Sequence, residues 1–192
     1  MSTDLSEGWD AVAWRFMARR SDIGTGLVRD WATAHVPPGG HIVDIGCGSG
    51  APIAQALIEA GFAVSGIDAS PTLVATFRER FPEAPVACEA AQYSAFFGRS
   101  FDAALCVGLL FLLSEADQST VIRRVAQALN PGGRFLFSAP LQVCDWPDSL
   151  TGRRSVSLGR DAYARLLEAS DLCLIDCRAD EGGNNYYDAV RA

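Results

Sequence analysis

Residues 43–50 read VDIGCGSG, an apolar stretch with an acid, Asp44, that runs directly into a loop containing three glycines. Glycine loses more conformational freedom on folding than any other residue, so such a cluster indicates a backbone that side chains would obstruct. The preceding HIVDI (41–45) is typical of a short buried strand, and the following APIAQALIEAG (51–61) of a helix. This order predicts a ligand-binding turn at the end of a strand.

The chain outside this stretch alternates strand-like and helix-like segments. Further strands are expected at 62–68, 85–88, 101–107, 132–140, 172–179 and 184–192, and helices at 7–21, 23–35, 70–81, 114–130 and 159–171. The alternation predicts a doubly wound α/β fold with a mostly parallel seven-stranded sheet. Because only a short loop separates the last two strands, they predict a hairpin that adds one antiparallel strand near the C-terminus.

Composition narrows the class of protein. The 192 residues carry 49% hydrophobic and 20% charged residues, which suits one globular domain. A net charge of −7 disfavours nucleic acid as the main partner, because phosphate binding needs a basic face. No apolar run reaches the roughly 18 residues of a membrane helix, and the acidic N-terminus does not resemble a secretory signal, so we expect a cytoplasmic protein without a membrane partner. The six cysteines form no C-x-x-C pair, and we expect no metal site.

The glycine loop fits two kinds of cofactor. Gly46, Gly48 and Ala51 match the dinucleotide pattern G-x-G-x-x-[G/A], and Asp68, at the end of the next strand, is placed to bind ribose hydroxyls. A pyrophosphate here would lie close to the like charge of Asp44. S-adenosylmethionine (SAM) carries no phosphate, and its ammonium suits Asp44. The residues therefore favour SAM, with a Rossmann-type NAD(P)-dependent oxidoreductase as an alternative.

The motifs, taken in order, resemble the class I SAM-dependent methyltransferases of the Rossmann-like, small-molecule type. The matching pieces are VDIGCGSG (43–50), GIDAS (66–70), CEAA (88–91), FDAALCVG (101–108) and LNPGGRFLF (129–137). The resemblance implies a SAM-dependent methyltransferase. The cofactor-binding positions that it implies are Asp44, Gly46, Cys47, Gly48, Ser49 and Gly50 in the first loop, Asp68, Ala69 and Ser70 after the second strand, Glu89, Ala90 and Ala91 after the third, and Val107 and Gly108 after the fourth.

The methyl acceptor is less clearly indicated. The family's Asn/Asp-Pro-Pro-Tyr/Phe motif of amino-methylating enzymes is missing after the fourth strand, where VGLLFLL stands, and no side chain is an obvious catalytic base. We expect a small, partly apolar molecule as the methyl acceptor, because ligand sites are mostly apolar with a few polar anchors. The residues expected to line its site are Trp14, Phe111, Trp146, Asn185, Tyr186 and Tyr187.

The N-terminal segment is expected to be a lid. Its two helices have no strand between them, and the vacant place near a ligand lies over the carboxyl edge of the sheet. Arg20 and Ser21 would then approach the cofactor. One domain, 1–192, thus divides into a helical lid (1–36), a cofactor-binding core (41–139) and a substrate loop with a C-terminal helix and hairpin (140–192). A non-catalytic SAM-binding regulatory or interaction protein is a further alternative.

Overall fold

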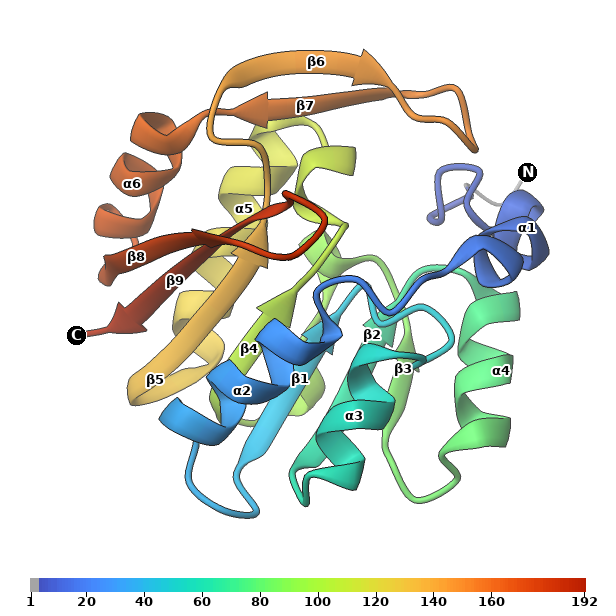
Figure 1. The fold of residues 1–192 in the computed structure, drawn as a ribbon, viewed down its shortest axis with the longest axis horizontal. Helices are drawn as coiled ribbons and strands as arrows, with labels where there is room; N and C mark the ends of the chain where they lie inside the picture. Colours follow the sequence, from blue (N-terminus) through green and yellow to red (C-terminus); the bar gives the residue numbers. More distant parts are fainter. Residues whose placement is uncertain (1–3) are drawn as a thin grey trace.

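A computed structural model describes residues 4–192 and contains a central seven-stranded sheet (Figure 1). The strand order is β3-β2-β1-β4-β5-β9-β8, and β9 is antiparallel to both of its neighbours, whereas the other pairs are parallel. The predicted fold class and the single antiparallel strand are therefore confirmed. The strands are β1 (His41–Ile45), β2 (Ala63–Asp68), β3 (Val86–Cys88), β4 (Phe101–Cys106), β5 (Leu129–Ser138), β8 (Leu172–Ala179) and β9 (Asn185–Arg191).

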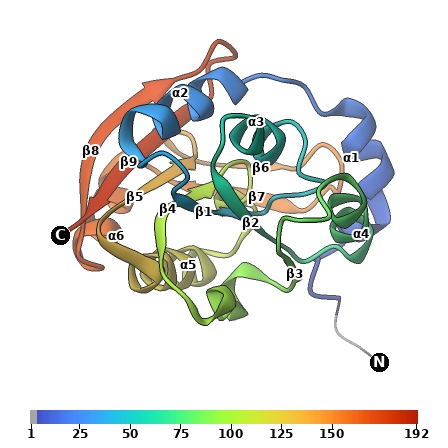
Figure 2. The same cartoon turned by 90° about the horizontal axis from the view of Figure 1, so that it is seen from below.

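Helices cover both faces of the sheet (Figure 2). One core cluster joins α2 (Thr25–His35), α3 (Ile53–Glu59) and α4 (Pro71–Arg80) to one face, and the other joins α5 (Glu115–Ala128) and α6 (Arg160–Glu168) to the opposite face. The apolar positions of each helix repeat at helical spacing, so each helix presents one buried stripe to the sheet. None of the helices in residues 4–192 is long and apolar enough to cross a membrane.

The N-terminal segment divides into two parts with different surroundings. A short 3₁₀ turn, η1 (Asp10–Val12), leads into α1 (Ala13–Arg19), which lies beyond the carboxyl edge of the sheet (Figure 1). By contrast, α2 buries Val28, Trp31 and Ala32 against the sheet and α3. The helix α2 is thus part of the helical layer that covers the sheet. Of the residues 1–36 expected to form a lid, only those before α2 remain candidates for it.

A second sheet replaces the loop that we expected after β5. Strands β6 (Val143–Pro147) and β7 (Arg154–Leu158) form an antiparallel hairpin that crosses above the carboxyl ends of the central strands (Figure 1). Its turn is held by Asp148, whose Oδ1 accepts hydrogen bonds from the Leu150 and Thr151 amides and from the Thr151 hydroxyl. All five residues of β6 are at least partly exposed, and this stretch lacks the apolar alternation that would predict a strand.

Three further 3₁₀ turns complete the elements. They are η2 (Ala91–Tyr93), η3 (Phe96–Gly98) and η4 (Leu110–Leu112). The first and third follow the carboxyl ends of β3 and β4, so they border the same edge of the sheet as the glycine loop.

Candidate functional site

A pocket opens at the carboxyl edge of the central strands, with a floor formed by the loops after β1, β2 and β4. In the first loop, Gly46, Gly48 and Gly50 all have positive φ (+75°, +56° and +82°), which residues with a side chain rarely adopt. A Cβ on Gly50 would lie 2.5 Å from the Phe81 ring, so close packing requires glycine there as well. The glycine cluster therefore shapes a tight turn at the pocket floor.

Asp44 is the acid that precedes this turn, and it is buried at the bottom of the pocket, 3% exposed. Burial raises the pKa of Asp44 to about 7, the Arg20 guanidinium acts in the opposite direction, and the Asp68 carboxylate adds to the rise. A buried carboxyl with a pKa this high is poised to ionise when a cation arrives.

Asp68 ends β2 and fixes the shape of the turn. Its Oδ2 accepts a hydrogen bond from the Gly48 amide (2.9 Å), and its Oδ1 accepts one from the Ser70 amide (2.8 Å). Burial raises the pKa of Asp68, while these two amide bonds lower it. Each carboxylate oxygen has room for a further donor, so the side chain can serve both the loop and a ligand.

The loops after β3 and β4 complete the floor. Glu89, Ala90 and Ala91 line the pocket after β3, with the Glu89 carboxylate accepting a bond from the Ser94 hydroxyl (2.5 Å). Val107 and Gly108 line it after β4, where the Ser138 hydroxyl accepts a bond from the Gly108 amide (2.8 Å).

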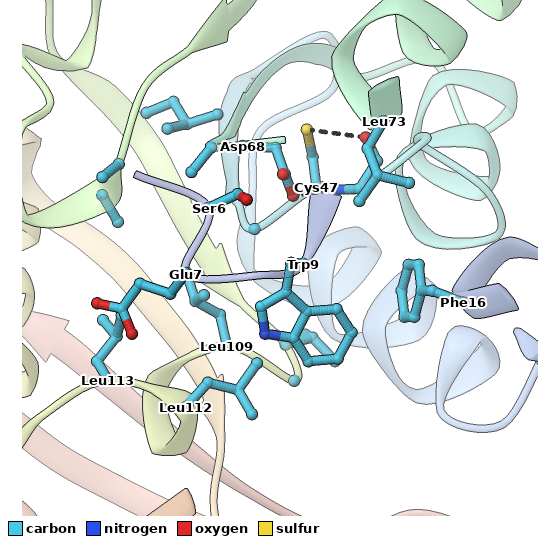
Figure 3. Close-up of a pocket in the computed structure, with 18 of the residues that line it drawn as sticks. Ser6, Glu7, Trp9, Phe16, Cys47, Asp68, Leu73, Leu109, Leu112 and Leu113 are labelled. Atoms are coloured by element: carbon cyan, nitrogen blue, oxygen red, sulfur yellow. Dashed lines mark hydrogen bonds between the residues drawn. The ribbon is translucent and has the colours of Figure 1, made fainter. Parts of the chain in front are cut away.

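The roof of the pocket comes from two distant parts of the chain, the segment 5–20 and the β6–β7 hairpin. Trp9 projects into the pocket with Phe16 on one side and Leu112 on the other (Figure 3). The Trp9 and Phe16 rings meet edge to face with centroids 5.6 Å apart, and Phe16 packs over Gly48. Trp9 and Phe16 therefore give the N-terminal part of the roof an aromatic surface, whereas the hairpin contributes polar and charged residues.

Polar bonds attach the N-terminal part of the roof to its surroundings. Asp10 Oδ1 accepts bonds from the Ser70 hydroxyl (2.6 Å) and the Thr72 amide (2.9 Å), at the start of α4. Glu7 and Arg153 of the hairpin turn form an ion pair of 2.6 Å. Hydrogen bonds thus attach the N-terminal segment to the start of α4, and an ion pair attaches it to the β6–β7 hairpin.

Most of the cofactor-binding positions expected from the sequence line this one pocket. They are Arg20, Asp44, Gly46, Cys47, Gly48, Asp68, Ala69, Glu89, Ala90, Ala91, Val107 and Gly108. The structure does not bring Ser49, Gly50, Ser70 and Ser21 to its lining. The Gly50 amide is bonded to the Cys47 carbonyl, Ser70 caps α4 and binds Asp10, and Ser21 is exposed between α1 and α2.

None of the six residues expected to contact the acceptor lines the pocket. Trp14 is 72% exposed on the outer side of α1. Phe111 and Trp146 pack on each other, with ring centroids 5.4 Å apart. The other three residues lie on β9. Asn185 pairs with Ala179 of β8, and Tyr186 is buried in the core. The Tyr187 ring stacks on that of Phe137, with ring centroids 4.7 Å apart. The tyrosines are core residues because β9 is an interior strand of the sheet.

Both roof segments fall in ranges expected to cover the site, the lid (1–36) and the substrate loop (140–192), but most of the residues that line the pocket there were not identified from the sequence. The additional lining residues are Leu5, Ser6, Glu7, Trp9, Phe16, Ala51, Ile53, Ile67, Leu73, Gln92, Leu109, Leu112, Leu113, Asp148, Thr151, Arg153, Arg154 and Ser155. The one available signal was the apolar character of Trp9 and Phe16 in a segment outside the sheet. Among the described residues, no group of His, Cys, Asp or Glu side chains is arranged to hold a metal ion.

A family model described as a methyltransferase domain matches residues 42–133. No curated protein matches the sequence.

Solved structures share the fold across nearly the whole chain. A 1,6-didemethyltoxoflavin-N1-methyltransferase of Burkholderia thailandensis has a TM-score of 0.79 at 17% identity, covering 100% of this chain and 92% of that one. A magnesium protoporphyrin IX methyltransferase of Synechocystis PCC 6803 has a TM-score of 0.77 at 16% identity, covering 100% and 99%. An amino pentose methyltransferase of Micromonospora echinaspora has a TM-score of 0.73 at 18% identity, covering 95% and 96%. At sequence identities of 16–18%, the similarity to these structures shows a shared fold and nothing further.

Proposed function

We propose that this chain is a class I SAM-dependent methyltransferase that transfers a methyl group from SAM to a small, partly apolar acceptor, and the match to a methyltransferase domain over residues 42–133 supports this. The observation that carries this proposal is the pocket itself. Its floor joins the glycine loop to two acids, and its roof, which includes the aromatic residues Trp9 and Phe16, is supplied by the same chain. The small-molecule acceptors named for the similar structures, a didemethyltoxoflavin and a magnesium protoporphyrin, support the substrate class.

The residues at the floor fit the chemical groups of SAM. Asp44 is buried at the pocket bottom and suits the ammonium. Arg20, on the roof, suits the carboxylate, and the free lone pairs of the Asp68 carboxylate suit the two ribose hydroxyls. We assign the segment Glu89 to Ala91 to the adenine and the segment Val107 to Gly108 to the sulfonium end.

Catalysis would rest on positioning. Bound SAM supplies an electrophilic methyl group with a neutral thioether as leaving group, so the acceptor atom must lie in line with that bond. Trp9 and Phe16 of the roof, together with Leu112 after β4, would orient the acceptor and exclude water. We assign no catalytic base. Neither histidine lines the pocket, because His35 ends α2 and His41 begins β1 at the opposite edge of the sheet.

Methyl transfer from labelled SAM to components of a metabolite extract, separated and detected by mass, tests this function. Transfer to compounds of low molecular mass supports it. SAM binding without transfer to any acceptor would favour a non-catalytic, regulatory SAM-binding protein.

The Asp44 carboxyl predicts a pH dependence of SAM binding. Because the ammonium of SAM favours the ionised carboxylate, binding should lower the pKa of Asp44 from about 7, and the affinity should rise with pH. Between pH 6 and pH 7.5 we expect a gain of about fivefold to tenfold, measured by isothermal titration. Asp44→Asn should weaken binding and flatten this pH profile. A wild-type affinity that stays constant over this range would contradict the pairing of Asp44 with the ammonium.

A further inference from the structure

Asp10, in η1, is bonded to the start of α4, about 60 positions away in the sequence. Its Oδ1 accepts hydrogen bonds from the Ser70 hydroxyl (2.6 Å) and from the Thr72 amide (2.9 Å). The Ser70 hydroxyl and the Thr72 amide lower the pKa of Asp10, so the carboxylate is charged at neutral pH. Both contacts are therefore hydrogen bonds to a charged group, which are the stronger kind.

The start of α4 is suited to receive this carboxylate. Pro71, the first helical residue, has no amide hydrogen, and the Leu73 amide donates to the Ser70 hydroxyl (3.2 Å). Of residues 71–73, only Thr72 is left with an amide that needs an acceptor from elsewhere, and Asp10 supplies it. The positive end of the helix dipole favours a negative charge at the same place. The N-terminal segment thus completes the cap of a core helix.

Ser70 connects this contact to the acid that we assign to the ribose. Its hydroxyl donates to Asp10, while its amide donates to Asp68 Oδ1 (2.8 Å). Ser70 itself is fully buried, so both bonds are shielded from water. One residue therefore binds the carboxylates of the pocket floor and of the segment that forms the roof.

The position of Asp10 determines the position of two aromatic rings. Trp9 directly precedes it, and Phe16 follows in α1. The two rings meet edge to face, and Phe16 packs over Gly48 of the glycine loop (Figure 3). Because the rings and the carboxylate belong to one short segment, the contact of Asp10 with α4 holds both rings over the pocket floor.

The other polar attachment of this segment is weaker. Glu7 and Arg153 form an ion pair, but their side chains are 36% and 55% exposed. Exposed ion pairs contribute little to stability, because solvent screens them and two long side chains must be ordered. Of the two attachments, the one made by Asp10 is therefore expected to hold the roof.

We propose that Asp10 is the positioning residue of the roof, and that its contacts with Ser70 and Thr72 hold Trp9 and Phe16 over the cofactor site. A cofactor bound to Asp68 beneath the roof would stabilise this docked position further. The inference rests on the proposed methyltransferase function for the identity of that cofactor. The docking of the roof can be tested without any ligand.

Fluorine nuclear magnetic resonance of protein labelled with 5-fluorotryptophan reports the position of the roof. The signals are assigned by replacing one tryptophan at a time with phenylalanine, and two of them serve as references, since Trp14 is 72% exposed and Trp31 is buried in the core. In Asp10→Ala the Trp9 signal should move towards that of Trp14, while the Trp31 signal stays in place. We expect the ratio of open to docked roof to rise about tenfold.

Three further variants make the comparison specific. Asp10→Asn keeps an acceptor oxygen but not the charge, so its Trp9 signal should lie between those of the wild type and Asp10→Ala. Asp22→Ala removes the same charge from an exposed position between α1 and α2 and should leave the Trp9 signal unchanged. Ser70→Ala should shift the Trp9 signal in the same direction as Asp10→Ala. The two substitutions together should have less than the sum of their effects, because both remove the same bond. Should Asp10→Ala not fold, Ser70→Ala carries the comparison.

Ligand binding adds a second readout. Saturation of Asp10→Ala with SAM, or with its demethylated product S-adenosylhomocysteine (SAH), should move the Trp9 signal part of the way back to its wild-type position. A Trp9 signal that does not move, although either ligand binds, would contradict a cofactor site beneath the docked roof.

Three results without ligand would overturn the role of Asp10. One is a Trp9 signal that keeps its wild-type position in Asp10→Ala. Another is an equal shift in Asp22→Ala, which would show a general effect of charge. The third is a shift of the Trp31 signal as large as that of Trp9, which would show that Asp10 supports the whole fold. In these cases the methyltransferase function would stand, whereas a wild-type protein that binds neither SAM nor SAH would contradict that function and leave the docking by Asp10 intact.

Discussion

Deletion of residues 1–20 is expected to lower methyl transfer by at least about a hundredfold while the seven-stranded sheet stays folded. The deleted part supplies Trp9, Phe16 and Arg20 to the pocket roof. Neither core cluster includes a residue before Leu27, so the segment contributes to the site and not to the main core. Without this roof, water would reach the methyl donor and the acceptor would lose its orientation. Methyl transfer and circular dichroism, measured on the same preparation, separate the two effects.

Two tryptophans of this segment provide a matched pair for the same prediction. Trp9 projects into the pocket, whereas Trp14 is 72% exposed on the outer side of α1. Trp9→Ala should lower kcat/KM strongly, and Trp14→Ala should leave it near the wild-type value.

We also expect SAM to slow hydrogen exchange across about residues 9–24, because a ligand under the roof stabilises its closed position. Full activity of the truncated protein would contradict the lid.

Asp68→Ala is expected to weaken SAM binding by at least about tenfold, because losing hydrogen bonds to a charged group costs roughly 2–4 kcal/mol and each 1.4 kcal/mol or so is a factor of ten. The substitution removes a carboxylate proposed to bind two ribose hydroxyls. It also removes the bonds to the Gly48 and Ser70 amides, so the glycine turn loses a support. Isothermal titration with SAM gives the affinity, and thermal unfolding checks that the fold survives.

A control for Asp68 needs an acid on a strand outside the pocket. Asp176 of β8 meets this need, because it pairs with Arg178 at the surface. Asp176→Ala should leave SAM affinity unchanged. If Asp68→Ala were equally neutral, Asp68 would serve the loop alone and the ribose assignment would be wrong.

The floor of the pocket was predictable because its residues form a local sequence pattern. The stretch around Gly46 and Gly48, together with Asp68 at the end of the next strand, identifies both the turn and the strands that carry it. In a parallel sheet the loops after these strands meet at one edge, so residues far apart in sequence gather there without further information. The resemblance to class I methyltransferases implied that Glu89 and Gly108 would lie at the same site, and both line the pocket.

The roof was not predictable in the same way, because its position depends on tertiary contacts between distant segments. The ion pair between Glu7 and Arg153 joins residues that lie 146 positions apart in the sequence. The prediction that Tyr186 and Tyr187 line the acceptor site was wrong for a related reason. A short aromatic motif does not reveal that its strand lies in the interior of the sheet, where both side chains are buried.

Isothermal titration of the wild-type protein with SAM and, separately, with NADH tests the central claim most directly. The claim is that the pocket binds a cofactor with an ammonium beside Asp44 and no phosphate. We predict binding of SAM at micromolar levels and no measurable binding of NADH. NADH binding as tight as or tighter than that of SAM would contradict it.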